Sequence, residues 1–244
     1  MRRKFADLNL KPSVRDFGSA EALFEKACEL GYSLVAASFP PDVNRERVAE
    51  FKRLCSGLGM DFAARVDLAP NSRRDLLRQL GRLRRRFEIV GVVCVSKAVA
   101  RQAAKDRRVD LLVFPEFDPR KRFFDPQEAE LASNALASLE VCMSSLLLAE
   151  GARRARLLSF LRREVAVASK FCVPVVVSSG ASEPWLLRKP RELAVLATLF
   201  DMDFSEALNA VSAVPLAIVR RNREKLSSRF VAPGIRLVRR GKDC

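Results

Sequence analysis

The sequence has 244 residues, of which 49% are hydrophobic, and this is enough to build a globular protein with a large core. Lysine and arginine number 44 against 29 aspartates and glutamates, and the resulting net charge of +15 favours a polyanionic partner. Histidine is absent and the six cysteines form no C-x-x-C pair, which excludes Ser-His-Asp and Cys-His catalysis and argues against a zinc site.

Hydropathy and cysteine usage predict a cytoplasmic protein without a membrane partner. No apolar run approaches the ~18–20 residues that span a bilayer. The segment "MRRKFADLNLKP" turns polar after the length of one strand, unlike a signal peptide. The scattered cysteines lie mostly in apolar periodic segments, where a reduced thiol behaves as a small hydrophobic group.

Seven short apolar segments predict β-strands. They cover residues 5–10, 32–39, 61–68, 89–96, 111–115, 138–143 and 173–179. Strands that are apolar on both faces and alternate with helices are typical of a parallel sheet covered by helices.

Helical periodicity fills the intervals between these strands. The predicted helices cover residues 19–31, 44–59, 72–87, 125–135, 152–171, 190–200 and 203–212. Asn44 and Ser72 have the side chains of helix N-caps, and Gly31 suits a left-handed C-cap. Pro190 is placed for a first helical position, and Asp203 with Glu206 has the spacing of a capping box.

The order of these elements predicts one domain over residues 1–244. Seven strands followed by a weaker one fit a closed barrel, and the segment "KPSVRDFGS" after the first strand has no G-x-G-x-x-G phosphate loop of an open doubly wound sheet. We therefore expect a distorted TIM-like (β/α) barrel of about seven to eight parallel strands with surrounding helices, followed by a short basic C-terminal tail from about residue 236.

Polar side chains at the carboxyl ends of the predicted strands are candidates for a site, because functional groups of such barrels project there. They are Asp7, Asn9, Ser38, Arg65, Asp67, Lys97, Glu116, Asp118, Glu140, Ser178 and Ser179. Four of the acids (Asp7, Asp67, Glu116 and Glu140) could hold Mg²⁺ through oxygen ligands. Arg65 and Lys97, however, would bring positive charge into the same mouth and favour phosphate over a dinuclear metal cluster. Alternatively, the acids cap helices or pair with these bases.

Two basic segments are candidates for contact with nucleic acid. In residues 72–87, Leu76, Leu80, Leu83 and Phe87 should point inward, and Arg74, Arg78, Arg82, Arg85 and Arg86 are left outside, facing either RNA or solvent. The segment "RRNREKLSSRF" combines guanidinium groups with Asn222 and Ser227, which can contact phosphate, sugar or base edges, although a solvated loop has the same composition. One tryptophan and one tyrosine make a broad stacking platform improbable, so phosphate and shape readout would dominate.

Three segments resemble a known family. These are "FADLNLKP" at the start, "GASEPWLLRKPRELAVLATLF" in the last third, and "SAVPLAIVRRNREKLSSRFVAPGIRLV" near the end. They are similar to archaeal ribonuclease P protein component 3 and its eukaryotic relative, the thirty-kilodalton subunit shared by ribonucleases P and MRP. The resemblance implies a TIM-like barrel related to polymerase-and-histidinol-phosphatase metallohydrolases that has lost the metal-binding histidines. Leu8 and Leu10 stand in the first strand, where barrel hydrolases carry such ligands.

The resemblance also implies a function in which the RNA subunit catalyses. In that family the RNA uses Mg²⁺ to remove the 5′ leader from precursor tRNA, and the protein helps the RNA to fold and tolerate lower Mg²⁺. The implied partners are ribonuclease P RNA, precursor tRNA, protein component 2 in a two-plus-two heterotetramer, and other ribonuclease P proteins. The chain itself then has no catalytic or metal-binding residue and no cofactor of its own.

The residues expected to bind RNA come from two sources. The matched segments supply Arg188, Lys189, Arg191, Arg220, Arg221, Asn222, Arg223 and Lys225, and the strand-end argument supplies Arg65 and Lys97. The alternative function is a metal-dependent phosphoesterase of the polymerase-and-histidinol-phosphatase type that uses the carboxylates alone.

Overall fold

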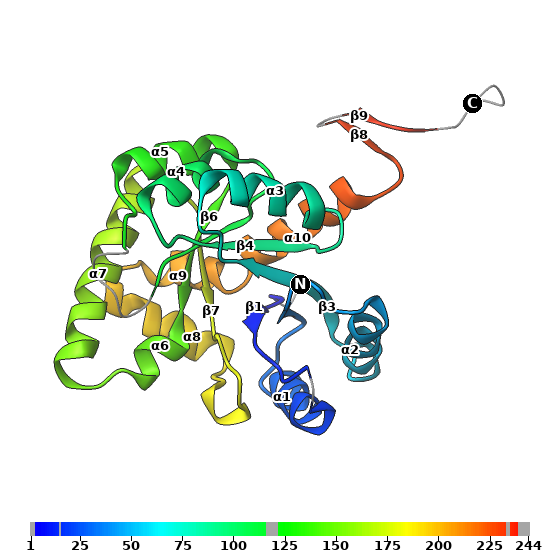
Figure 1. The fold of residues 1–244 in the computed structure, drawn as a ribbon. Helices are drawn as coiled ribbons and strands as arrows, with labels where there is room; N and C mark the ends of the chain where they lie inside the picture. The colour runs from blue at the N-terminus through cyan, green and yellow to red at the C-terminus, as the bar shows by residue number, and fades with distance from the viewer. Residues whose placement is uncertain (1–2, 15, 116–121, 233–234, 239–244) are drawn as a thin grey trace.

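The computed structural model describes residues 3–14, 16–115, 122–232 and 235–238, and its centre is a parallel sheet surrounded by helices (Figure 1). The strands of this sheet follow the chain order, and each pairs in parallel with the next. They are β1 (Ala6–Leu10), β2 (Leu34–Phe39), β3 (Asp61–Leu68), β4 (Ile89–Val93), β5 (Leu111–Val113), β6 (Ser138–Cys142) and β7 (Val175–Ser178). All seven lie within the segments predicted from the sequence.

The first and last of these strands approach each other and nearly close the sheet into a barrel. The Lys11 amide donates to the carbonyl of Ala181 at 2.8 Å, and the Ser179 amide donates to the carboxylate of Asp7 at 3.2 Å. The TIM-like barrel prediction is therefore confirmed. The weaker eighth strand does not join the barrel, because β8 (Phe230–Ala232) pairs antiparallel with β9 (Ile235–Arg236) in a separate hairpin, which stands away from the body (Figure 1).

The helices begin largely where the sequence predicts. They are α1 (Phe17–Glu29), α2 (Arg45–Gly57), α3 (Arg73–Leu83), α4 (Lys97–Lys105), α5 (Pro126–Ala135), α6 (Met143–Leu148), α7 (Gly151–Lys170), α8 (Pro190–Ala197), α9 (Phe204–Ala210) and α10 (Ala213–Leu226), with short 3₁₀ turns η2 (Pro184–Leu186) and η3 (Thr198–Phe200). The side chains of Asn44 and Ser72 accept first-turn amides, as expected of caps. Asp203 caps α9 through the amide of Ser205 instead of the predicted reciprocal box with Glu206.

Three helices, α4, α6 and α10, are absent from the sequence prediction. The largest omission is α10, whose basic segment "RRNREK" suggested an exposed loop. Pro215 did not prevent this helix, because it lies in the first turn, where the backbone amide has no intrahelical partner. Among the described residues, no helix combines the length and hydropathy needed to cross a membrane.

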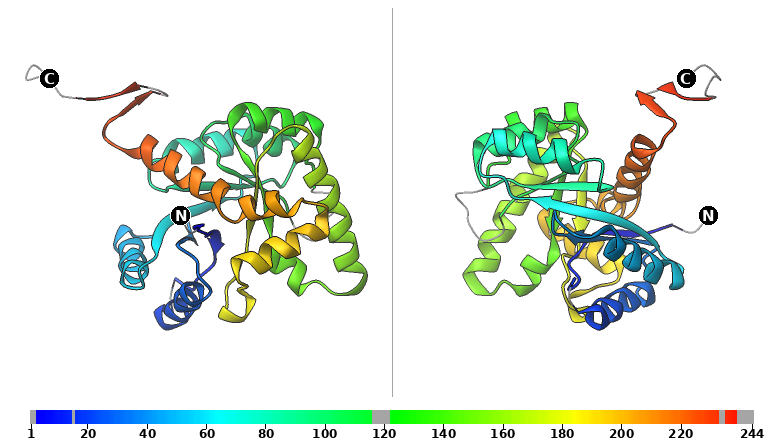
Figure 2. Two further views of the ribbon diagram at one scale, coloured as in Figure 1. Left: turned by 180° about the vertical axis from the view of Figure 1, so that it is seen from behind. Right: turned by 45° about the vertical axis from the view of Figure 1, so that its right-hand side comes forward.

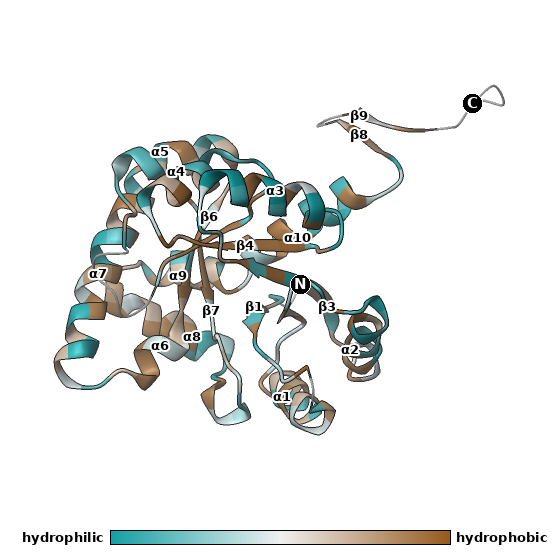
Figure 3. Ribbon diagram, in the orientation of Figure 1, coloured by the Kyte–Doolittle hydropathy of each residue, from teal (hydrophilic) through white to brown (hydrophobic). Residues whose placement is uncertain are grey.

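Apolar side chains form two cores, one on each side of the barrel wall. The larger core lies between the sheet and the outer helices and includes Leu10. The smaller one fills the barrel and includes Leu8, and it is covered by Ile218 and Val219 of α10. Figure 3 shows the inner strands largely in brown (apolar) and the outer faces of the helices in teal (hydrophilic). Helix α10 lies across the barrel (Figure 2, left) and closes the end at which the strands begin.

Candidate functional site: the polar layer of the barrel and the basic surface

A polar layer surrounds Arg65, whose side chain is fully buried inside the barrel near the ends of the strands. Its guanidinium donates to Asp67 at 2.7 and 2.9 Å, to both oxygens of Glu140 at 2.6 and 2.5 Å, and to the carbonyl of Leu8 at 2.8 Å. All five N–H groups of the guanidinium thus have acceptors. One side chain ties β1, β3 and β6 together.

Small residues complete this layer. Ser38 donates to Asp67 at 2.7 Å, and Ser178 donates to Glu140 at 2.7 Å. Gly91 of β4 leaves room for the ion pair, since a Cβ atom there would come within 2.2 Å of Asp67 Oδ1. Burial raises the pKa of Asp67, but the charge and hydrogen bonds of Arg65 outweigh this, so its pKa lies below the usual value.

This geometry does not fit a metal centre built from the strand-end acids. The oxygens of Asp67 and Glu140 face a guanidinium in the place where a divalent ion would have to bridge them. Asp7 accepts the amides of Asn9 and Ser179, and burial raises its pKa, which weakens it as an anionic ligand. Glu116 and Asp118 lie outside the described residues. Within those residues, no group of three metal-ligating acids, cysteines or histidines occurs.

Lys97 does not join the layer around Arg65. It occupies the first turn of α4, and its half-exposed ammonium pairs with Asp125, the N-cap of α5, at 3.0 Å. The sequence placed Arg65 and Lys97 in one mouth because both follow strands closely. The structure separates them, because Arg65 points into the barrel from within β3, whereas Lys97 begins the next helix.

The basic residues of α10 are divided between the fold and the surface. Arg223 donates to Asp61 at 2.6 and 2.9 Å, to Glu88 at 3.3 Å and to the carbonyl of Phe62 at 2.7 Å. These hydrogen bonds, the one to Asp61 above all, raise its pKa. Asn222 is fully buried, and its amide nitrogen donates to the carbonyl of Glu88 at 2.8 Å. Both residues fasten α10 to the beginnings of β3 and β4.

A cluster of cations combines residues of the same helix with Arg84 at the end of α3. Arg221 donates to Asp110 at 3.1 Å and to the carbonyl of Leu136 at 2.9 Å, and Arg84 donates to Asp110 at 2.9 Å. Lys225 lies partly buried beside them, where burial and the nearby charges, that of Arg221 first, lower its pKa. Arg220 is exposed. Arg220 and Lys225 therefore keep cationic groups available at this end of the barrel.

The start of α8 and the two residues before it hold three of the predicted RNA-binding residues. Arg188 folds back on its own turn, donating to the carbonyls of Trp185 and Leu187 at 2.7 and 2.8 Å. Lys189 and Arg191 are exposed and line a pocket of 490 Å³ together with Arg3 and Lys4. The sequence interpretation missed Arg3 and Lys4, because nothing local indicates that the chain start lies beside residues 189–191.

The predicted positions thus differ in access to a ligand. Arg65 and Asn222 are buried, which corrects the expectation that they present an RNA-facing surface, since the barrel and α10 cover them. Arg221 and Arg223 are partly exposed but paired with acids. Contact with RNA by the exposed members stays a prediction.

The exposed arginines of α3 and of the turn that follows it match the sequence analysis. Leu76, Leu80, Leu83 and Phe87 are buried, and Arg74, Arg78, Arg82, Arg85 and Arg86 are exposed. Arg78 pairs with Asp75 at 2.7 Å within the helix. Arg86 donates to the carbonyl of Val43 at 3.1 Å. The helix therefore presents a basic outer face, as its periodicity predicts.

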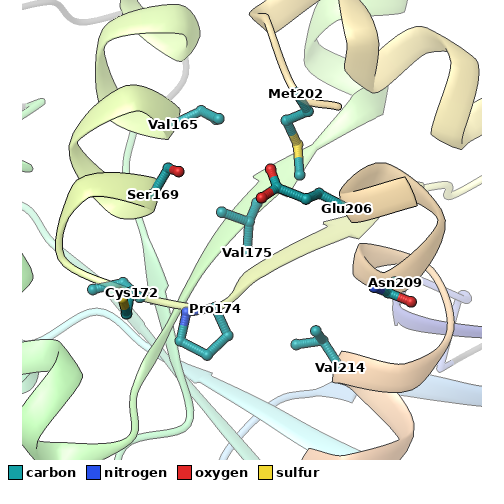
Figure 4. A pocket seen from close by; sticks show the side chains of 10 residues that line it. Val165, Ser169, Cys172, Pro174, Val175, Met202, Glu206, Asn209 and Val214 are labelled. Atoms are coloured by element: carbon teal, nitrogen blue, oxygen red, sulfur yellow. The ribbon is translucent and has the colours of Figure 1, made fainter. Parts of the chain in front are cut away.

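An apolar pocket lies between α7, α9 and the start of α10 (Figure 4). It has a volume of 280 Å³, and Val165, Met202 and Val214 contribute apolar walls. A neighbouring pocket of 510 Å³ shares Val214 and reaches Arg220 and Arg221. Among the described residues that line the first pocket, Glu206 is the single carboxylate, so the pocket has no pair of carboxylates for acid–base catalysis.

Comparison with known proteins gives consistent matches along the chain. The family model "RNase P subunit p30" matches residues 4–227. Ribonuclease P protein component 3 of Methanococcoides burtonii is 29% identical over 236 residues, which cover 96% of this chain and 94% of the relative. The protein of the same name from Methanosarcina acetivorans is 32% identical over 165 residues, covering 68% and 69% of the two chains.

Solved structures agree on the fold. A chain in the cryo-EM structure of archaeal ribonuclease P with mature tRNA superposes with a TM-score of 0.82 at 22% identity, covering 97% of this chain and 99% of that one. An amidohydrolase from Mycoplasma synoviae matches with a TM-score of 0.52 at 11% identity, covering 88% and 87%. At these identities the superpositions show a shared fold and nothing further.

Proposed function

The chain belongs to the RNase P subunit p30 family, and from this premise we propose that it binds and stabilises the catalytic RNA of ribonuclease P, which removes the 5′ leader from precursor tRNA. The observation that carries the proposal is the position of Arg65, which occupies the site between Asp67 and Glu140 where a hydrolase of this fold would need a metal ion. The ion pair thus occupies the two carboxylates that a metal-dependent reaction would need. Catalysis then belongs to the RNA and its Mg²⁺.

The charge of the chain supports the contact with RNA. Each ion pair uses one cation and one acid, so the net charge of +15 is an excess of cations that acids cannot neutralise, and exposed cations occur at the start of α8 and on α10. Among the predicted residues, Lys97, Lys189, Arg191, Arg220 and Lys225 are the ones with accessible ammonium or guanidinium groups. Arg65 and Asn222 support the interaction indirectly by holding the barrel and α10 in place.

The family membership also supports a partner protein. Component 2 is the proposed partner, in a two-plus-two heterotetramer within a cytoplasmic ribonucleoprotein that contains further ribonuclease P proteins. Exposed apolar side chains fit such contacts better than contacts with RNA. Val195, Leu199 and Phe204 are 55%, 43% and 44% exposed around α8 and the start of α9.

RNA affinity at several salt concentrations tests the proposal. Because phosphate contacts release counterions, the affinity of the protein for ribonuclease P RNA should fall by about 10³-fold or more between roughly 50 and 200 mM salt. A flat response would contradict RNA binding through phosphates.

The same preparation addresses the carboxylate-only phosphoesterase. Incubated with Mn²⁺ and a phosphomonoester, the purified chain should give no turnover above buffer. Turnover that disappears in Asp67→Asn and persists in Asp75→Asn would restore the enzymatic alternative, since Asp75 is an acid of α3 outside the polar layer.

A further inference from the structure

A basic pocket lies at the end of the barrel where β1 and β2 begin. Three segments that are far apart in sequence form it, namely the residues before β1, the connection from α1 to β2, and the start of α8. Figure 1 shows the segment that precedes α8 (yellow) beside α1 (blue), and α1 also contacts η2. The pocket has a volume of 490 Å³, within the range of about 300–1,000 Å³ for small-ligand sites.

Hydrogen bonds fix the walls of this pocket. The carbonyl of Phe5 accepts the amide of Ser33 at 2.9 Å and its hydroxyl at 2.8 Å, which joins the chain start to the α1–β2 connection. Tyr32 donates through its hydroxyl to the carbonyl of Arg188 at 3.0 Å, which joins that connection to the start of α8. Burial, followed by the charges of Asp7 and Glu192, raises the pKa of Tyr32, so the phenol keeps its proton. The pocket is therefore preorganised.

Four cations line this pocket, and none of them forms an ion pair with an acid in the part of the chain that the structure describes. The exposed side chains of Arg3, Lys4, Lys189 and Arg191 contribute them, and no acid of the described residues pairs with any of the four. The nearest acid in sequence, Glu192, accepts the backbone amide of Lys189 at 3.1 Å. Arg84, Arg221 and Arg223, by contrast, are all paired with carboxylates. Unpaired cations that converge on a fixed cavity favour an oxyanion ligand.

We propose that this pocket binds a phosphate group of an RNA strand, an inference that rests on the proposed function and specifies one of its contact sites. A phosphodiester matches the charge of the four cations, and the open shape of the pocket leaves room for the rest of the strand. Trp185, the only tryptophan of the chain, is 63% exposed in the turn that carries Arg188, where it can stack on an adjacent base.

A matched pair of double variants tests the pocket. Lys189→Gln with Arg191→Gln removes two of its charges, and Arg82→Gln with Arg85→Gln removes two exposed charges from α3 and the turn that follows it. Dissociation constants for ribonuclease P RNA are measured against salt for both variants and for wild type. We expect the pocket variant to bind about tenfold or more weakly, and the magnitude of its salt slope to fall by roughly 1.4 to 1.8, as for two lost phosphate contacts. The melting temperature should stay at the wild-type value.

The possible results distinguish a failure of the pocket proposal from a failure of the proposed function. Salt-dependent binding by wild type with equal losses in both variants, or with no loss in the pocket variant, overturns the pocket and leaves the function standing. Absence of salt-dependent binding by wild type overturns the function itself. The last measurement is a titration with inorganic phosphate, monitored by the fluorescence of Trp185. A phosphate response abolished in the pocket variant, with RNA affinity unchanged, would assign the site to a free anion and overturn its assignment to RNA.

Discussion

Helices α3 and α10 carry similar basic sequences but use their arginines in opposite ways. The arginines of α3 lie on its exposed face, because the leucines on the other face pack against the barrel wall. In α10 the barrel receives Ile218, Val219 and Asn222, and the neighbouring Arg221 and Arg223 therefore meet the acids at the strand starts. Arginines in a helix therefore either stay exposed or pair with acids of the fold, depending on where the opposite face of the helix packs. Arg65 is the extreme case, since it has no exposed surface.

The largest effect expected from this comparison is at Arg65. Arg65→Leu would leave Glu140 fully buried and Asp67 largely buried without their cation, so we expect a loss of about 3–5 kcal/mol of unfolding free energy. Urea denaturation measures it. Arg65→Lys should recover part of the loss, because it restores the charge without the five donors. A loss below about 1 kcal/mol in the leucine variant would contradict the scaffold role.

Arg223 should show an intermediate effect. Arg223→Ala removes the hydrogen bonds to Asp61, Glu88 and the carbonyl of Phe62, and we expect a loss of about 1–2 kcal/mol because the side chain is partly exposed. Arg220→Ala, on the exposed face of the same helix, is the matched control and should leave stability unchanged. Equal melting temperatures for the two variants would remove the distinction between scaffold and surface in α10.

Glu128 is a buried acid that forms no ion pair with the described residues, and its effect on stability should depend on pH in the opposite direction to that of paired acids such as Asp67. Burial, then the charge of Asp125, raises the pKa of Glu128 to about 7, so its contribution to stability is fully present below about pH 4.5 and is lost as the pH rises through 7. With no histidine in the chain, few other groups titrate there. We expect wild type to lose about 2 kcal/mol between pH 5 and 8. This loss should vanish in Glu128→Gln and persist in Glu130→Gln, an exposed position of α5. A similar slope in all three proteins would refute the assignment.

The smallest stability effect belongs to α3. Replacing Arg74, Arg78 and Arg82 by glutamine should change the unfolding free energy by no more than about 0.5 kcal/mol, because these side chains are exposed. Thermal unfolding monitored by circular dichroism is sufficient. A larger loss of unfolding free energy would show that these arginines stabilise the fold, as the paired arginines of α10 do, and would contradict the difference between the two helices.

The features predicted from sequence are those with a local cause. Strands that are apolar on both faces and caps such as Asn44 and Ser72 follow from the nearest neighbours in the chain, and they are confirmed. The environment of Arg65 depends on Glu140, which lies 75 residues away, so no local pattern could place this arginine inside the barrel. Helix α10 was missed for the same reason, because its buried face is defined by the barrel end that it covers.

Reconstituted cleavage of precursor tRNA tests the central claim most directly. The catalytic RNA is assayed at limiting Mg²⁺ with the presumed partner protein, with and without this chain. We expect the chain to increase cleavage at the mature 5′ end, and Asp67→Asn and Glu140→Gln variants that remain folded to support the same increase, because these acids stabilise the barrel and do not react. Cleavage that is unchanged by the chain, or that requires its carboxylates in a correctly folded protein, would contradict a non-catalytic RNA-binding subunit.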